Sequence, residues 1–314
     1  AHYDMSIANG KLTDVTNSGF DAEYVGFTEG DFLEEENDKI LNFTGDKSKY
    51  VKLPLGLIDD ETFTIETTFS TSTSAAHWLY SIGNKTGVWP NVKNYIFLNP
   101  KQGNGNVRFG IKDSDKELLF QNATIHSGEK NTFTTTFKEG EISLYLNGEL
   151  VGTLPHTYSV MDILKEGVDP TTNSIGFIGK SLFEPDAAFT GKLADFKVYN
   201  YTLSAEEIKE NATLTDKEIV DLAKANLAIP NADDIRGNLT LPTSSDKGAS
   251  ITWETDRPDV VSVNKEENEN YDDIPAGVVT RQNSDTQVKL TATIHSGQVS
   301  DTKQIILTVK AKTE

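Results

Sequence analysis

The first two hundred residues alternate apolar and polar side chains in short segments that turn residues separate. Segments such as "FTIETTFS" (63–70), "VRFGIKD" (107–113) and "EISLYLNGEL" (141–150) show this period of two. That period indicates β-strands with one buried face. Asn147-Gly148 predicts a tight hairpin turn. The even spacing of the segments is typical of an antiparallel sandwich or jelly roll.

Two segments change to a helical period and mark a domain boundary. The stretch "GKLADFKVYNYTLSAEEIKEN" (191–211) begins as a strand and ends as a short helix that Ser204 caps. The stretch "TDKEIVDLAKANLAIP" (215–230) predicts a second helix that ends at Pro230. Short strands then resume to the end of the chain. We therefore expect two domains, 1–212 and 213–314, and the second, preceded by a short helix, has the size of an immunoglobulin-like sandwich.

Composition excludes several classes of partner. The formal net charge is -19, which repels nucleic acid and anionic lipid headgroups. Cysteine is absent, so neither a disulfide nor a thiolate site is possible. No apolar run approaches the ~20 residues that a membrane span needs. The first residues, "AHYDMSIANG", show no signal-peptide pattern, so we expect either that a signal was removed or that this is an internal piece of a longer chain. The internal piece is favoured because "HYDMS" is already strand-like.

No pattern of catalytic residues emerges. Enzymes on β-sandwiches usually carry paired carboxylates on one strand at alternating positions, and here Glu66 stands alone in its strand. The five histidines are far apart, without metal-binding spacing, and there is neither a phosphate-binding loop nor a nucleophile elbow. We therefore expect no enzyme in this chain. The alternative of a stand-alone hydrolase needs a carboxylate pair that the sequence does not show.

Aromatic and amide residues concentrate between residues 77 and 100. Sugars bind to exposed aromatic rings flanked by amides and carboxylates. The ligand-binding candidates are therefore Trp78, Trp89, Asn91, Asn94, Tyr95 and Arg108. Trp78 and Tyr80 fall on one face of a predicted strand, so a core role is the simpler interpretation for both. Trp89, beside Pro90 in a polar loop, is the better ligand candidate.

A cluster of hard oxygen ligands lies near the N-terminus. The segment "LTDVTNSGFDAE" (12–23) brings together Asp14, Asn17, Asp21 and Glu23, and Asp195 lies in the last strand of the first domain. Calcium prefers such oxygen ligands. An Asx turn without an ion explains the same residues equally well.

Several blocks in order resemble a known family. "LNFTGDKSKYVKLP", "ISLYLNGELVGT", "SIGFIGKS" and "FTGKLADFKVYNYTLSAEEIKEN" resemble the laminin-G-like, concanavalin-like jelly-roll domains of bacterial carbohydrate-active enzymes, over residues 1–212. Residues 215–312, with "GASITWETDRPDVVSV" and "TKQIILTV", resemble bacterial immunoglobulin-like modules. The resemblance implies an all-β chain: a jelly-roll sandwich followed by an immunoglobulin-like β-sandwich.

The resemblance also implies a function and a cofactor. Such pairs flank the catalytic propeller of secreted glycosidases, including the arabinofuranosidase and xylosidase types of glycoside hydrolase family forty-three. Where family members bind structural calcium, an early-loop carboxylate and one near the last strand contribute, which implicates Asp14, Asp21 and Asp195. The early loop reads "DVTNSG" in place of the tighter turn of many relatives.

We therefore expect a non-catalytic carbohydrate-binding region of a secreted or cell-surface bacterial glycoside hydrolase. Its expected partners are a polysaccharide or oligosaccharide and the catalytic domain of the same parent chain, with no nucleic acid and no membrane span. The alternative is a structural or adhesive module that packs against a catalytic domain or binds a host surface without sugar specificity.

Overall fold

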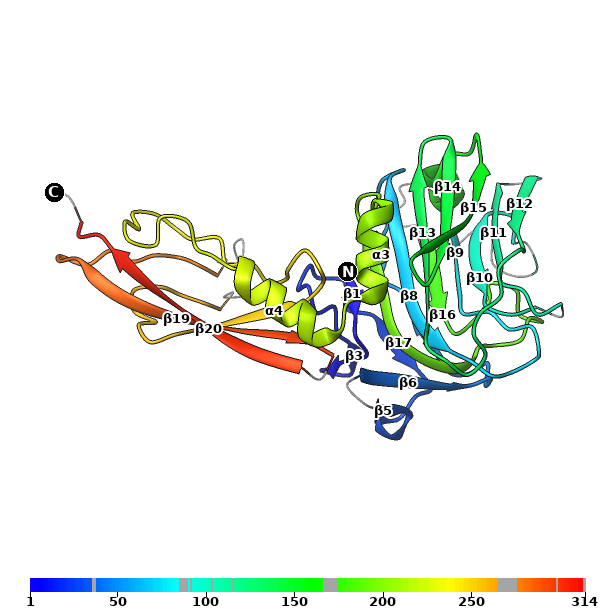
Figure 1. The fold of residues 1–314 in the computed structure, drawn as a ribbon, viewed down its shortest axis with the longest axis horizontal. Helices are drawn as coiled ribbons and strands as arrows, with labels where there is room; N and C mark the ends of the chain where they lie inside the picture. Colours follow the sequence, from blue (N-terminus) through cyan, green and yellow to red (C-terminus); the bar gives the residue numbers. More distant parts are fainter. Residues whose placement is uncertain are drawn as a thin grey trace. The chain divides into compact units, whose positions relative to one another are not determined.

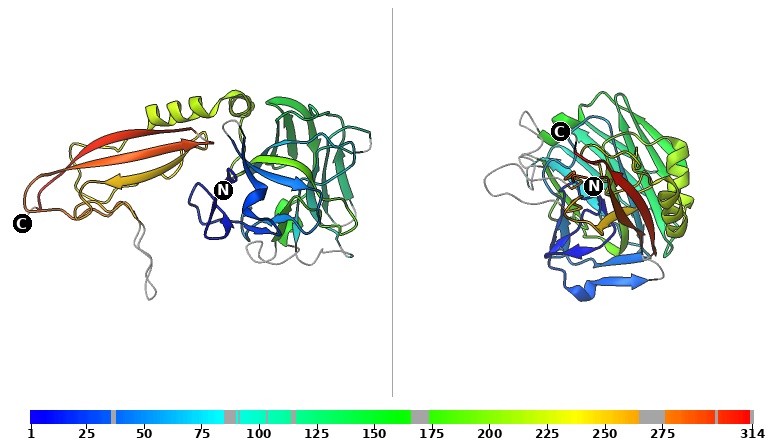
Figure 2. Two further views of the ribbon diagram at one scale, coloured as in Figure 1. Left: turned by 90° about the horizontal axis from the view of Figure 1, so that it is seen from below. Right: turned by 90° about the vertical axis from the view of Figure 1, so that its left-hand side faces the viewer.

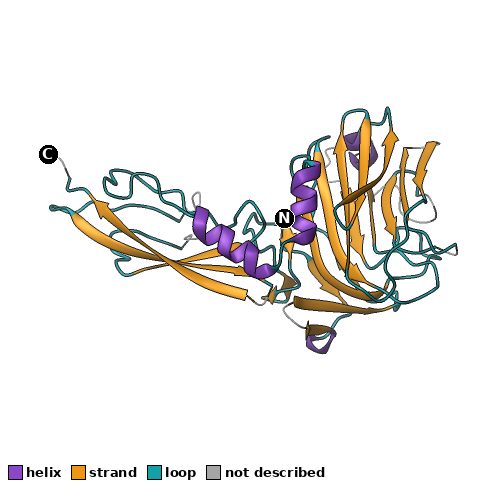
Figure 3. Ribbon diagram, in the orientation of Figure 1, coloured by secondary structure: helices purple, strands orange, loops and turns teal. Residues whose placement is uncertain are grey.

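The chain forms two compact units, Ala1–Thr213 and Leu214–Glu314. A computed structural model describes residues 1–314 except 36–37, 85–89, 91, 103, 114–115, 166–173, 265–275, 298 and 313–314. Strands dominate both units (Figure 3). The predicted all-β class is thereby confirmed. Among the described residues, no helix is long and apolar enough to cross a membrane.

One layer of the first unit is an eight-stranded antiparallel sheet with the order β15-β14-β13-β8-β17-β6-β5, in which β1 also pairs with β17 (Figure 1). Its strands are β1 (His2–Tyr3), β5 (Phe32–Glu35), β6 (Asp38–Thr44), β8 (Phe63–Ser70), β13 (Asn131–Lys138), β14 (Glu141–Leu146), β15 (Glu149–Pro155) and β17 (Thr190–Tyr199).

The second layer is a seven-stranded antiparallel sheet with the order β12-β11-β10-β9-β16-β7-β4. Figure 2 shows the ribbon from two further sides. Its strands are β4 (Glu23–Val25), β7 (Tyr50–Lys52), β9 (Tyr80–Asn84), β10 (Tyr95–Asn99), β11 (Arg108–Asp113), β12 (Lys116–Phe120) and β16 (Ser174–Ile178). A separate hairpin joins β2 (Ile7–Ala8) to β3 (Lys11–Leu12).

The core of the first unit lies between these two sheets, because each strand turns every second side chain inward. On β8 these are Phe63, Ile65 and Phe69, which are all buried. Phe63 stacks on Phe137 of β13 with 4.1 Å between ring centroids. The period of two in the sequence therefore has its expected cause.

Among the described residues of the first unit there are three short helices: η1 (Glu29–Asp31), α1 (Val160–Lys165) and α3 (Ala205–Thr213). The predicted cap of α3 is confirmed, since the Glu207 N–H donates to Ser204 Oγ at 3.2 Å and the Ser204 N–H donates to Glu207 Oε2 at 2.7 Å. Leu203 and Ile208 pack with Tyr145 of β14. This helix therefore covers the outer face of the eight-stranded sheet.

The described part of the second unit contains a three-stranded sheet, β18-β19-β20, and one helix. Its elements are α4 (Asp216–Asn226), β18 (Ser250–Thr255), β19 (Thr286–Ser296) and β20 (Val299–Val309). Thr215 and Glu218 form a capping box at the start of α4. Val220 and Ala223 of this helix belong to the core of the unit, as does Trp253, whose Nε1 donates to the Pro242 carbonyl at 2.8 Å.

Candidate functional site

Aromatic residues gather on the outer face of the seven-stranded sheet. We call this surface the aromatic face and define it by Trp78, Tyr95, Phe97, Phe177 and Phe183, which belong to a hydrophobic cluster separate from the main core. The cluster forms because β10 is apolar on both sides. Ile96 and Leu98 point into the main core, so Tyr95 and Phe97 point outward.

The rings of this face contact one another edge to face or at a tilt. The Phe97 centroid lies 6.3 Å from that of Trp78 and 5.8 Å from that of Tyr95. Tyr95 meets Phe183 in a T-shaped contact at 5.4 Å. Trp78 is half-buried and so presents part of its ring to solvent. A partly exposed ring held by packed neighbours is the type of surface that stacks on the C–H face of a sugar.

Charged groups border the rings. The Arg108 guanidinium lies over the Phe97 ring, 5.3 Å from its centroid. Tyr95 Oη donates to Glu117 Oε1 at 2.6 Å, and Arg108 Nη2 lies 3.9 Å from Glu117 Oε2. About a quarter of each of the Arg108 and Glu117 side chains is exposed, 28% and 27%. Donors and acceptors for sugar hydroxyls therefore stand beside the rings.

The electrostatics of these groups follow from partial burial. Burial, together with the hydrogen bond to Glu117 and its charge, raises the pKa of Tyr95 above its usual range, so its hydroxyl stays a donor. Burial raises the pKa of Asp186 above its ordinary value, although its hydrogen bond from Ser181 Oγ at 2.6 Å and the charges of Lys47 and Arg108 oppose this. Asp186 is thus a second carboxyl group near Arg108.

Two N–H donors at one end of this face have no acceptor among the described protein groups. They are Arg108 Nε and Asn99 Nδ2. Asn99 on β10 and Arg108 on β11 are register partners, so their side chains are neighbours on one face. A buried donor without a partner costs free energy, which an acceptor that reaches it recovers. This end of the aromatic face therefore offers two N–H donors to a hydrogen-bond acceptor of a ligand.

The structure brings together three of the six predicted ligand residues. Trp78, Tyr95 and Arg108 surround Phe97. Asn94 is only 2% exposed, so its amide is not presented at the surface. Trp89 and Asn91 lie outside the described residues. For all six residues ligand binding stays a prediction.

The expectation that Trp78 and Tyr80 share a face is wrong. Tyr80 is buried in the main core, with 5.7 Å between its ring centroid and that of Phe196. Trp78 packs with the residues of the aromatic face instead. Leu79, between them, is also fully buried in the core, and β9 begins only at Tyr80. Strict alternation therefore starts at Tyr80, two residues after Trp78.

Sequence reasoning missed Phe97, Glu117 and Asp186. Phe97 has a visible signal, since "YIFL" is apolar at four consecutive positions and so must bury both faces of its strand. Glu117 and Asp186 have none. They reach the site through the pairing of β11 with β12 and through the 181–186 turn, which only the folded chain reveals.

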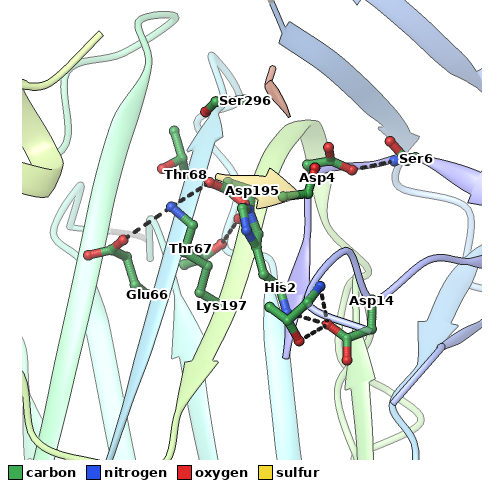
Figure 4. Close-up of polar contacts among 12 residues, drawn as sticks. His2, Asp4, Ser6, Asp14, Glu66, Thr67, Thr68, Asp195, Lys197 and Ser296 are labelled. Atoms are coloured by element: carbon green, nitrogen blue, oxygen red, sulfur yellow. Dashed lines mark hydrogen bonds and ion pairs between the residues drawn. The ribbon is translucent and has the colours of Figure 1, made fainter. Parts of the chain in front are cut away.

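Two of the three predicted calcium ligands, Asp14 and Asp195, contact different atoms of His2 (Figure 4). The Asp14 carboxylate accepts from the His2 N–H at 2.9 Å, from the N–H and hydroxyl of Thr16 at 3.2 and 2.7 Å, and from Ser18 Oγ at 2.5 Å. Burial opposes ionisation of Asp14, but these hydrogen bonds hold its pKa below the ordinary value. Asp21 Oδ1 accepts from the Asp14 N–H at 2.8 Å.

Asp195 instead belongs to an ion-pair network on the outer face of the eight-stranded sheet. Its Oδ1 lies 2.6 Å from His2 Nε2, and its Oδ2 lies 2.8 Å from Lys197 Nζ. Lys197 Nζ is also 3.6 Å from Glu66 Oε1, so the ammonium lies between two carboxylates (Figure 4). Burial alone would raise the pKa of Asp195, but His2 and Lys197 hold it well below its usual range.

As arranged, Asp14, Asp21 and Asp195 do not fit one calcium site. The oxygens of Asp195 already face two basic groups, and the Asp14 carboxylate is filled by N–H and O–H donors. Over the described ranges, no group of three or more His, Cys, Asp or Glu side chains is placed to hold a metal ion. Calcium binding by these residues stays a prediction.

A sandwich of two antiparallel sheets, as in the first unit, is the fold class of jelly rolls. Residues 44–209, more than half of the chain, match the family model described as the concanavalin A-like lectin/glucanases superfamily. The chain belongs to this superfamily. Residues 220–312 match the model of the atrophied bacterial Ig domain. Both predicted resemblances are confirmed.

Solved structures are similar to part of this chain. One is domain 4 of AbnA, a GH43 extracellular arabinanase from Geobacillus stearothermophilus, in complex with arabinotriose. It is 17% identical, with a TM-score of 0.51, over 67% of this chain and 96% of that domain. The CBM40 of Ruminococcus gnavus IT-sialidase, bound to α2,3 sialyllactose, is 24% identical with a TM-score of 0.40, over 50% of this chain and 82% of that one. No curated protein matches the chain in sequence.

Proposed function

We propose that the first unit is a non-catalytic carbohydrate-binding module of a secreted or cell-surface bacterial glycoside hydrolase, and that the second unit is its immunoglobulin-like spacer. The observation that carries the proposal is the aromatic face, where half-buried Trp78 and the Arg108 guanidinium both lie against the Phe97 ring and Glu117 lies beside Arg108. The fold shared with an arabinanase domain that was solved with arabinotriose agrees with it. The module would concentrate substrate around an attached catalytic domain.

The carboxylates of the face support binding rather than hydrolysis. Glu117 accepts from Tyr95 and faces Arg108, and Asp186 accepts from Ser181. Hydrolysis of a glycosidic bond needs two carboxyl groups that flank it, one of them free to donate a proton. Here both groups already hold neighbouring side chains in place. We therefore expect no release of reducing sugar from any polysaccharide that the chain binds.

Trp78→Ala is expected to weaken binding of a neutral oligosaccharide by about tenfold or more, because a packed aromatic anchor at the centre of a site contributes at least ~1.4 kcal/mol. A glycan array on the full chain selects the ligand, and isothermal titration measures its dissociation constant. Arabinotriose is the first probe.

Tyr201→Ala is the matched control, since Tyr201 is 43% exposed and lies outside the aromatic face. It should bind as the unsubstituted chain does, and thermal unfolding should show both variants folded. Equal affinity of Trp78→Ala and the unsubstituted chain would remove the proposed site. Binding of no glycan at all would favour the structural or adhesive module instead.

A further inference from the structure

A pocket lies on the other outer face of the first unit, over the eight-stranded sheet. Its volume is about 320 Å³, near the lower end of the ~300–1,000 Å³ that small-molecule sites occupy. The hairpin of β5 and β6, the end of β8, the 128–130 loop and β17 contribute its walls. None of the residues of the aromatic face takes part.

The pocket lies where the pairing partner of β17 changes from β6 to β1. Strand β6 pairs with β17 as far as Leu193, and β1 pairs with it from Phe196 onward. Between these points the register with β8 shifts at Ala194, which lines the pocket. Such β-bulges are frequent beside functional sites, because they re-aim side chains and interrupt pairing.

Ion pairs from two directions close the walls. Glu35 and Asp38 are register partners in the hairpin of β5 and β6. Lys192 Nζ on β17 lies 2.5 and 2.7 Å from the two Glu35 oxygens, and Lys130 from the loop pairs with Asp38. Roughly two fifths of the Lys192 and Glu35 side chains are exposed, 40% and 42%, so a ligand can reach them. Exposed ion pairs of this kind contribute little to stability.

This lining selects for the charge of the ligand. Two lysines and three carboxylates, Glu129 being the third, surround the pocket. A cation would meet the lysines, and an anion would meet the more numerous carboxylates. A neutral hydroxyl can accept from an ammonium and donate to a carboxylate at once. Ile40 and Ala194 add a small apolar surface for the C–H groups of such a ligand.

We propose that this pocket is a second sugar site that binds one or two residues of a neutral glycan, which rests on the proposed function for the class of ligand. The two sites lie on the outer faces of different sheets. The module therefore binds two separate stretches of polysaccharide, not two neighbouring residues of one short oligosaccharide.

The test is an NMR titration of the full chain with arabinotriose, and with maltotriose as a second neutral probe. Backbone amide signals of Ser70, Gly128 and Ala194 should shift on addition of a probe, and should do so equally in Trp78→Ala. The double variant Glu129→Ala/Lys130→Ala should lower the affinity of the pocket for the probe by about tenfold, because hydrogen bonds to charged groups are stronger than those between neutral groups. Lys138→Ala/Glu139→Ala removes the same two charges elsewhere and should bind as before.

The outcomes separate the two proposals. Shifts at the aromatic face alone, with silent pocket signals at saturation, overturn the second site and leave the proposed function standing. Shifts in the pocket alone support this inference and overturn the aromatic face as the binding site. Pocket shifts that Glu129→Ala/Lys130→Ala leaves unchanged also overturn it.

Discussion

Asp195→Ala is expected to lower the free energy of unfolding of the first unit by about 3 kcal/mol, because it leaves the partly buried Lys197 ammonium without its main counter-charge. Lys197 Nζ lies 2.8 Å from Asp195 Oδ2, and its side chain is 14% exposed. The estimate takes the low end of the range for a broken buried pair, since the Asp195 side chain is 23% exposed. His2 loses its 2.6 Å partner as well, so β1 should loosen from β17.

Urea unfolding of the full chain measures this effect. In a Trp253→Phe background the remaining tryptophans, Trp78 and Trp89, belong to the first unit, so their fluorescence reports that unit alone. Glu141→Ala is the matched control, because Glu141 forms an exposed pair with Lys138 on the same sheet and should cost no more than about 1 kcal/mol. Equal losses in the two variants would show that the network does not stabilise the fold.

The effect of Asp195 has a defined pH window. Its folded-state pKa is depressed, so its stabilisation is complete above the unfolded value near 4 and is lost as pH falls toward the folded value. The difference between Asp195→Ala and the unsubstituted chain should therefore be constant from pH 7 to 5 and shrink below about pH 4.

His77 should make the first unit less stable as the pH falls from about 7 to 4, by roughly 3 kcal/mol. Burial lowers its pKa from 6.5 to about 4. Its ring stacks on Phe189 with 5.0 Å between centroids, and Nδ1 accepts from the Thr190 N–H at 3.0 Å. Between pH 6.5 and 4 the unfolded chain binds a proton that the folded chain does not, so protonation favours unfolding.

His77→Phe keeps a ring against Phe189 and removes the titration. Its own cost is about 1 kcal/mol for the lost hydrogen bond from Thr190, at every pH. In the same urea experiment at several pH values, the free energy of unfolding that is lost between pH 7 and 4 should be smaller in His77→Phe by about 3 kcal/mol. His126→Gln is the control, because the His126 side chain is 66% exposed and should leave that loss unchanged. The same loss of unfolding free energy in His77→Phe as in the unsubstituted chain would show that His77 does not cause the pH dependence.

The sequence predicted most of what depends on local pattern. The period of two gave the β class, and the Ser204 and Thr215 caps marked two helices, because capping involves residues only three positions apart. The resemblance in block order predicted the superfamily. These inferences need no knowledge of which strands become neighbours.

Pairing between distant segments explains what the sequence could not show. Asp195 fitted a calcium ligand until the fold placed Lys197 and His2 beside it, and His2 lies 193 positions away. Phe97 reaches Trp78, and Arg108 reaches Phe97, only through the register of β9, β10 and β11. Tyr80 and Trp78 lie on different faces because regular alternation begins after Leu79. The sequence pattern does not show to within one residue where a strand begins.

A crystal structure of the full chain with a bound neutral oligosaccharide would show whether the aromatic face is the sugar-binding site. We expect a sugar ring against Trp78 on the outer face of the seven-stranded sheet, with its hydroxyls within hydrogen-bond distance of Arg108 and Glu117. An oligosaccharide bound only at other surfaces, with Trp78 and Arg108 left bare, would contradict this expectation.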